Sequence, residues 1–231
     1  DEAQKLDMEA WLYDEDRWPS GAAGGLVTKN PKHRMRHLKL EILPNPTPLK
    51  WTPDILAVFS ADIDGTNASN VIRLTRTTSR KAQDASVGSS LLIFRAQQDK
   101  LSPWYNGYTY LDTLSVPAVA QFIKTTHEAY RKRIGKHFGA RVPGIFTDEP
   151  NYGMHDADTR AWTDSLPSVF RKRYGYDLID RLPELFFNID GREISGARYH
   201  YYDCITYLFV NAFSNQIGQW CAKNSLLYTG H

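Results

Sequence analysis

The sequence has few cysteines, no long hydrophobic run and almost no excess of charge. Its two cysteines, Cys204 and Cys221, are too few for a disulfide framework and lack the paired spacing of a zinc site. We therefore expect two buried thiols. No run of about 18 apolar residues is present, which argues against a membrane-spanning helix. The formal net charge of +2 supplies no field strong enough to predict a nucleic-acid-binding protein.

The composition is that of a folded domain. Hydrophobic residues make up 42% and charged residues 23% of the 231 positions, which is too apolar for a disordered chain. The first residues lack the initiator Met, the basic segment and the apolar segment of a secretion signal. Residues 1–6 are typical of the end of a helix and residues 226–229 of the start of a strand. We therefore expect a fragment of a longer protein.

Short apolar runs alternate with segments of helical periodicity. Four runs predict buried strands, each followed by polar or acidic residues: 8–13, 89–94, 141–146 and 226–229. Apolar residues recur at helical spacing in four further segments: 116–138, 163–174, 178–187 and 199–223. Such alternation predicts an α/β fold with a parallel sheet and right-handed crossovers.

The length of the chain limits how much of a barrel it can form. A complete (β/α)8 barrel takes about 250 residues, so the chain would supply a partial TIM-type barrel of about four strands. An open doubly wound sheet is the alternative. Residues 36–80 have a different sequence pattern: short segments of alternating apolar and polar residues are separated by turn residues, as in β-hairpins. We predict one barrel-domain fragment, residues 1–231, with a β-rich insertion at about 36–80.

Three consecutive carboxylates, Asp14, Glu15 and Asp16, come directly after the first predicted strand. In α/β barrels the reacting groups lie at the carboxyl ends of the strands. Carboxylates this close raise one another's pKa and attract a cation or a cationic transition state. The alternative is a solvated acidic turn.

A second acidic pair, Asp148 and Glu149, follows the third of these strands, and Pro150 restricts the chain beside it. An apolar strand that ends in two carboxylates on a fixed loop is a rigid way to hold a general acid or a metal ligand. The alternative is a helix N-cap. His231 follows the fourth strand, where an imidazole can bind a sugar hydroxyl or an ion. A purely structural histidine is the alternative.

Aromatic side chains gather in the loops after the predicted strands. Trp18, Trp104 and Tyr105 lie there, and Asn106 follows them. The apolar C–H faces of sugar rings pack on aromatic rings, while amides and carboxylates bind the hydroxyl groups. Core packing is the alternative. His127 and Glu128 lack the His-Glu-x-x-His spacing of a zinc site and are expected to be scaffold.

Residues 11–25 resemble a signature of glycoside hydrolase family 106, the α-L-rhamnosidases and their uncharacterised relatives. Four further motifs resemble the same family in the same order: 104–107 with 110–112, 122–130, 146–150 and 229–231. The similarity extends over nearly the whole chain and is weakest in the predicted insertion.

The resemblance implies a (β/α)8 barrel within a large exported enzyme, extracellular or periplasmic, that cleaves terminal glycosidic bonds. It also implies inversion and a calcium ion, as in characterised α-L-rhamnosidases. The strands that carry Tyr13, Phe94, Phe146 and Tyr228 would be the third to sixth of the barrel. The remaining strands would come from the rest of the same polypeptide, so we expect the fragment alone to be inactive.

We expect Glu149 to protonate the leaving oxygen or to bind a metal ion, and Glu15 or Asp16 to bind substrate or activate water. The residues expected to bind the carbohydrate substrate are Asp14, Trp18, Trp104, Tyr105, Asn106, Asp148 and His231. One alternative is a non-catalytic barrel that binds glycans. A metal-dependent phosphoesterase is weaker, because no His-x-Asp or paired-His motif accompanies the carboxylates.

Overall fold

The computed structural model describes residues 2–76, 88–153 and 156–231 and divides the chain into two compact units. Unit 1 consists of Asp1–Met35, Gln98–Gly153 and Tyr207–His231. Unit 2 consists of Arg36–Gln97 and Met154–Thr206. The second unit therefore includes more of the chain than the insertion that the sequence predicts, and it is built from two separate segments.

Unit 1 contains a parallel sheet of three short strands. They are β1 (Leu12–Tyr13), β6 (Gly144–Thr147) and β9 (Leu227–Gly230), in the order β1-β6-β9. Phe146 in the middle strand pairs with Tyr13 on one side and with Thr229 on the other. Three of the four predicted strands thus lie in one parallel sheet, and the residues that follow them leave the sheet at the same edge.

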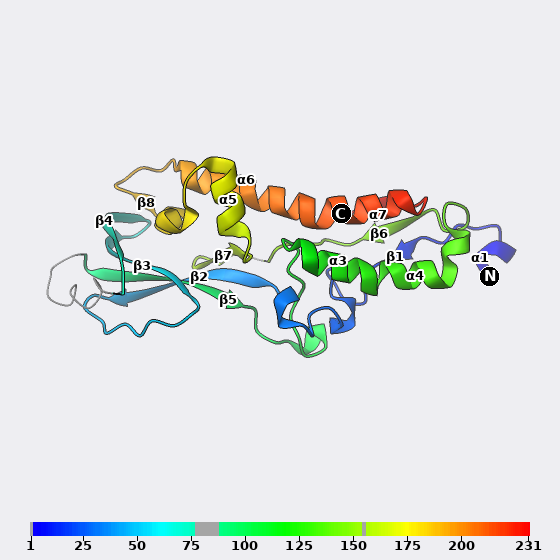
Figure 1. Cartoon of the computed structure of the whole chain (residues 1–231), viewed down its shortest axis with the longest axis horizontal. Helices are drawn as coiled ribbons and strands as arrows, with labels where there is room; N and C mark the ends of the chain where they lie inside the picture. Colours follow the sequence, from blue (N-terminus) through cyan, green and yellow to red (C-terminus); the bar gives the residue numbers. More distant parts are fainter. Residues whose placement is uncertain (1, 77–87, 154–155) are drawn as a thin grey trace. The chain divides into compact units, whose positions relative to one another are not determined.

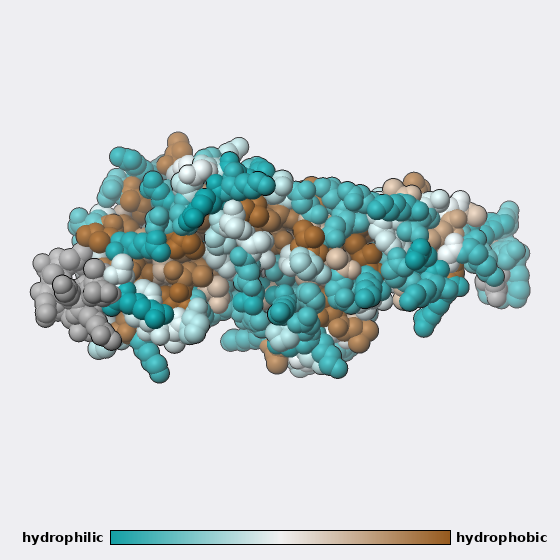
Figure 2. Space-filling model, viewed as in Figure 1, coloured by the Kyte–Doolittle hydropathy of each residue, from teal (hydrophilic) through white to brown (hydrophobic). Residues whose placement is uncertain are grey.

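Three helices accompany this sheet (Figure 1): α3 (Val116–Thr125), α4 (His127–Ile134) and α7 (Asn215–Lys223). Their apolar residues share one core with Ile145 of β6, and this core includes Phe122, Phe213 and Ile217. The charged side chains of α4 give this helix a hydrophilic surface (Figure 2). The predicted helix 116–138 is therefore present, but it is divided at Thr126.

Several short elements complete unit 1. They are α1 (Glu2–Lys5), η1 (Ala23–Gly25), η2 (Pro31–His33), η3 (Pro103–Tyr105), η4 (Gly135–His137) and the π-helical turn η6 (Val210–Ser214). The predicted helix end near the N-terminus is confirmed by α1.

Unit 2 contains a six-stranded sheet in the order β7-β2-β5-β3-β4-β8. The strands are β2 (Arg36–Pro44), β3 (Ile55–Asp64), β4 (Asn67–Leu74), β5 (Ser90–Gln98), β7 (Thr159–Trp162) and β8 (Asn188–Ile189). β3 and β4 form an antiparallel hairpin within the segment for which the sequence predicts a β-rich insertion. Residues 77–80 of the predicted insertion lie outside the described residues.

One strand prediction is wrong. Residues 89–94, expected to form a barrel strand, belong to β5, which pairs antiparallel with β3 through Val58 and Ile93. A fully buried strand is a continuous apolar run whichever way its neighbours point, so hydrophobicity alone does not distinguish a barrel strand from a central antiparallel one. Leu92, Ile93 and Phe94 are all fully buried, which accounts for that run.

The remaining helices agree with the predicted segments. They are α5 (Leu166–Tyr174) and the 3-10 helix η5 (Leu178–Leu185) in unit 2, and α6 (Gly196–Phe209), whose residues after Thr206 belong to unit 1. Gly175 ends α5 in the left-handed conformation, with φ of 79°. Both cysteines are buried free thiols, as expected. Within the described parts of the chain, no helix has the length and hydropathy needed to cross a membrane.

Candidate functional site

The carboxyl edge of the three-stranded sheet brings the acidic motifs of unit 1 together. Backbone hydrogen bonds continue past the strand ends: Glu149 N–H donates to the carbonyl of His231 at 2.7 Å, and His231 N–H donates to Thr147 at 3.3 Å. On the other side of β6, the N–H of Asp14 donates to Phe146 at 3.3 Å. The three predicted loop segments therefore leave the sheet as immediate neighbours.

The hydroxyl of Tyr13 links two of the carboxylates. Its oxygen lies 2.5 Å from Oδ2 of Asp148 and 2.9 Å from Oε2 of Glu15. A phenol has one proton to donate, so two ionised carboxylates at this oxygen would compete for it. Burial is the main influence that raises the pKa of Glu15; the hydrogen bond from Tyr13 opposes it, and the charges of Asp148 and Asp14 add to the rise, so the pKa lies above its ordinary value. The hydrogen bond to Asp148 is the main influence that raises the pKa of Tyr13.

Glu149 has an unusual backbone conformation. Its φ is 41°, in the left-handed region that non-glycine residues rarely occupy, and Pro150 follows it. The indole N–H of Trp18 donates to Oε2 of Glu149 at 3.1 Å. About half of the glutamate side chain is exposed (51%). Strained backbone of this kind is concentrated at functional sites, because the surrounding structure must hold it in place.

His231 lies between the two carboxylates of the β6 loop. Its Nε2 is 3.4 Å from Oδ1 of Asp148, and its Nδ1 is 3.5 Å from Oε1 of Glu149. One ligand atom from each of these three residues lies within 4.8 Å of the others. Two carboxylates and an imidazole are a donor set that a divalent cation can use.

Hydrogen bonds join the loop after β1 to the loop after β6. Ser20 N–H donates to the carbonyl of Asp148 at 2.9 Å, and its Oγ accepts from Asp148 N–H at 2.9 Å. The hydroxyl of Tyr110 donates to the carbonyl of Ser20 at 2.5 Å. Sequence reasoning missed Ser20, because a serine in a Pro-Ser-Gly loop is typical of any turn.

Asp14 faces the interior rather than the edge. Its side chain is fully buried, Oδ2 accepts from the hydroxyl of Thr147 at 2.8 Å, and Nε2 of His127 lies 3.2 Å from the same oxygen. Asp14 is thus separated from solvent in this structure, whereas Glu15 is half-buried and Asp16 is exposed. His127 was expected to be scaffold, and it lies within the core of unit 1 beside Phe122 and Trp220.

The predicted aromatic residues have different environments. Trp18 and Trp104 are 44% and 50% exposed, and the indole N–H of Trp104 donates to the carbonyl of Trp18 at 2.7 Å. The guanidinium of Arg17 lies over the Trp104 ring, 5.5 Å from its centroid. Tyr105 packs against the core of unit 1, and Asn106 is exposed and ends η3 with φ of 54°. The two tryptophans are therefore the aromatic residues that this loop cluster exposes most.

Comparison with known proteins gives a family match. A family model described as alpha-L-rhamnosidase, Glyco_hydro_106, matches residues 88–229. No curated protein matches the chain. Among solved structures, the rhamnosidase from Novosphingobium sp. PP1Y is similar at 18% identity and a TM-score of 0.44. That match covers 71% of this chain and 17% of the other, so the chain spans less than a fifth of that protein.

Proposed function

The chain belongs to the Glyco_hydro_106 family of alpha-L-rhamnosidases, and from this we propose that it forms part of a glycosidase that hydrolyses a terminal α-L-rhamnoside or a related sugar. The reacting groups are the carboxylates at the edge of the β1-β6-β9 sheet. The observation that carries the proposal is the Tyr13 hydroxyl, because its two contacts hold Glu15 and Asp148 together beside Glu149.

We propose that β1, β6 and β9 are neighbouring strands of a (β/α)8 barrel whose other strands come from the rest of the polypeptide. Their parallel order and common carboxyl edge support this. The active enzyme then requires the longer protein. We further propose that this protein is exported and meets its carbohydrate substrate outside the cytoplasm.

Glu15 is the better candidate for the general acid. A carboxyl group that donates a proton near neutral pH needs a raised pKa, and burial together with nearby negative charge raises that of Glu15. The sequence led us to expect Glu149 to protonate the leaving oxygen or to bind a metal ion, and Glu15 or Asp16 to bind substrate or activate water, so the proton donor is now assigned to Glu15. In the revised assignment, the more exposed Glu149 activates the attacking water or binds an ion. The sugar is then contacted by Asp16, Trp18 and Trp104.

Calcium, which the family resemblance implies, prefers about six to eight oxygen ligands. The carboxylates of Asp148 and Glu149 fit this preference, and Oδ1 of Asp148 is buried with no hydrogen-bond partner among the described residues. The imidazole of His231 is a less usual calcium ligand. A cation held by the two carboxylates would supply fixed positive charge for binding sugar hydroxyls.

Two glutamine substitutions in the full-length protein test the assignment. Glu15→Gln removes the proton donor, so hydrolysis of a rhamnoside with a poor leaving group should slow by about 10²- to 10⁴-fold. A dinitrophenyl rhamnoside needs little protonation of its leaving group and should be much less affected. Glu149→Gln should slow hydrolysis of both substrates by orders of magnitude.

Glu9→Gln is the matched control, because it makes the same chemical change at an exposed glutamate just before β1. Steady-state kcat on each substrate is the measurement. Equal losses on both substrates for Glu15→Gln would contradict its role as the acid, and an unchanged rate for Glu149→Gln would remove that residue from the mechanism. Binding of oligosaccharide without hydrolysis by the intact protein would indicate a glycan-binding barrel instead.

A further inference from the structure

We propose that a buried cluster of Asp14, His127 and Thr147 positions the carboxylates of the site. The inference rests on the proposed function and extends it to residues that do not touch the substrate. Asp14 and Thr147 are each 2% exposed and His127 is 0% exposed. The cluster therefore lies in the core of unit 1, and two of its members each precede by one residue a carboxylate at the edge of the sheet.

The contacts converge on one oxygen. Oδ2 of Asp14 accepts a hydrogen bond from the Thr147 hydroxyl at 2.8 Å and lies 3.2 Å from Nε2 of His127. The ring nitrogens of His127 make no hydrogen bond among the described residues, so Nε2 is a close polar neighbour of this oxygen. A buried carboxylate is strongly unfavourable unless donors or an opposite charge compensate it. The Thr147 hydroxyl is the donor at Oδ2, whereas Oδ1 of Asp14 is buried without a hydrogen-bond partner among the described residues.

The position of the cluster in the chain lets it fix the positions of the site carboxylates. Asp14 immediately precedes Glu15, and Thr147 immediately precedes Asp148. The hydrogen bond between Asp14 and Thr147 thus joins the last positions before two loops whose carboxylates meet at the Tyr13 hydroxyl. Movement of Asp14 would shift Glu15 relative to its partner.

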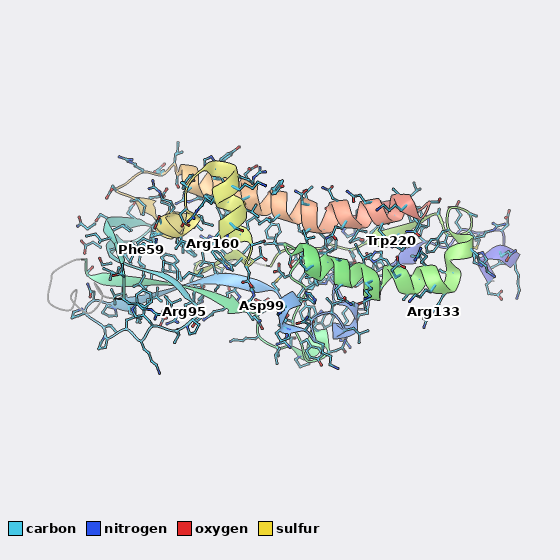
Figure 3. All side chains as sticks on the ribbon, in the orientation of Figure 1. Phe59, Arg95, Asp99, Arg133, Arg160 and Trp220 are labelled. Carbon is cyan, nitrogen blue, oxygen red and sulfur yellow. The ribbon has the colours of Figure 1, made fainter. Side chains whose placement is uncertain are left out.

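The imidazole is itself fixed by the surrounding rings. The His127 ring makes edge contacts with Phe122 and Trp220, with centroids 5.1 and 5.2 Å away. Trp220, which projects from α7 (Figure 3), donates its indole N–H to Glu128 of α4 at 2.7 Å. The helix layer therefore holds His127 against Asp14, and Asp14 in turn holds the loops.

The experiment uses the full-length protein and two pairs of variants. Thr147→Val keeps the shape of the side chain but removes the hydroxyl, whereas Thr147→Ser keeps the hydroxyl. His127→Leu removes the ring nitrogens, whereas His127→Gln keeps an N–H donor near the position of Nε2. Because none of these groups reaches the substrate, Thr147→Val and His127→Leu should lower kcat on an aryl rhamnoside by about 10- to 100-fold with little change in KM.

The conservative variants should retain most of that kcat. Ile217→Ala controls for simple loss of stability, because Ile217 is fully buried in the same core but does not belong to the Asp14, His127 and Thr147 cluster. It should lower the melting temperature and leave kcat unchanged at temperatures well below melting. Unchanged kcat in Thr147→Val and His127→Leu, with only a lower melting temperature, would show a merely structural role and overturn the inference.

A crystal structure of Thr147→Val separates this inference from the proposed function. The inference predicts that Glu15 and Asp148 no longer both lie within hydrogen-bond distance of the Tyr13 hydroxyl. Retention of both contacts would overturn it whatever the activity of the protein. A wild-type protein inactive on every rhamnoside tested would contradict the proposed function, while the positions of the carboxylates in the variant would still decide the positioning role.

Discussion

At the edge where β6 and β9 meet, Gly230 has no room for a side chain. A Cβ atom there would lie 1.9 Å from the carbonyl oxygen of Thr147 and 2.9 Å from its carbonyl carbon. Both atoms belong to the backbone of the neighbouring strand and cannot rotate away. The glycine therefore allows β9 to approach β6 closely enough to place His231 beside Asp148.

Gly230→Ala should destabilise the protein by about 1–3 kcal/mol, because β9 must move away from β6 to relieve the overlap. Urea unfolding is the measurement. Gly218→Ala is the control, since its Cβ would meet only Tyr228 Cδ1 at an ordinary 3.6 Å. Gly218 lies inside α7, where alanine is favoured over glycine by about 0.5–1 kcal/mol, so this variant should be more stable. Equal effects of the two substitutions would contradict the argument.

The sequence predicted that carboxylates lie at this edge of the sheet, but not which of their side chains point into the core and which point to solvent. Asp14, Glu15 and Asp16 were expected to face the site in some combination, and the structure separates them into a buried, a half-buried and an exposed carboxylate. That separation depends on partners more than a hundred residues away, Thr147 and His127. Pairing at that distance along the chain leaves no local signal in the sequence.

Among the helices, a side-chain hydrogen bond joins α4 to α7. Glu128 accepts from the Trp220 indole N–H at 2.7 Å and pairs with Arg131 at 2.8 Å. The Trp220 hydrogen bond, followed by the Arg131 contact, lowers the pKa of Glu128 below its ordinary value. A depressed carboxyl pKa adds stability above the unfolded-state pKa, and that contribution is lost as the pH falls through the folded-state value.

Glu128→Gln should therefore cost about 1 kcal/mol of stability at pH 7, because the charge is lost while an oxygen acceptor remains for Trp220. The difference from the wild type should shrink as the pH falls below about 4.3, where the unfolded-state glutamate is protonated. Thermal unfolding of both proteins between pH 3 and pH 7 is the measurement. A difference that is constant over this range would indicate that the charge of Glu128 contributes nothing.

The helices were predictable because their signals are local and long. The amphipathic pattern of 116–138 has its counterpart in α3 and α4, and the predicted segments 163–174 and 178–187 have theirs in α5 and η5. β5 was misassigned because an apolar run reports burial but not the direction of the neighbouring strands. The break at Thr126 was also missed, because the apolar spacing continues on both sides of it.

The whole chain combines two units that alternate along the sequence. The polypeptide leaves unit 1 after Met35 and returns at Gln98, and it leaves again after Gly153 and returns at Tyr207. In unit 1, the residues that flank each of the two unit 2 segments, 36–97 and 154–206, lie close together. Asp99 N–H donates to the carbonyl of Met35 at 3.1 Å, and the Tyr152 and Phe209 ring centroids are 5.7 Å apart. Short linkers can therefore replace both of these unit 2 segments.

This arrangement predicts opposite outcomes for two deletions in the full-length protein. Removing only residues 36–80, the insertion suggested by the sequence, takes away β2, β3 and β4. Leu91, Leu92, Ile93 and Phe94 of β5, now at most 4% exposed, would then lose their partner strands. An exposed apolar strand without neighbours is an aggregation site, so this protein should be insoluble.

Replacing both 36–97 and 154–206 by short Gly/Ser linkers should instead leave soluble protein, because all sixteen buried residues of the unit 1 core belong to the retained segments. Size-exclusion chromatography and thermal unfolding compare the two deletions. A soluble 36–80 deletion together with an aggregated double replacement would mean that the two units do not fold on their own cores. Since β1, β6 and β9 all remain, the carboxyl edge that carries Glu15 and Glu149 should survive the double replacement, and hydrolysis of an aryl rhamnoside measures whether it does.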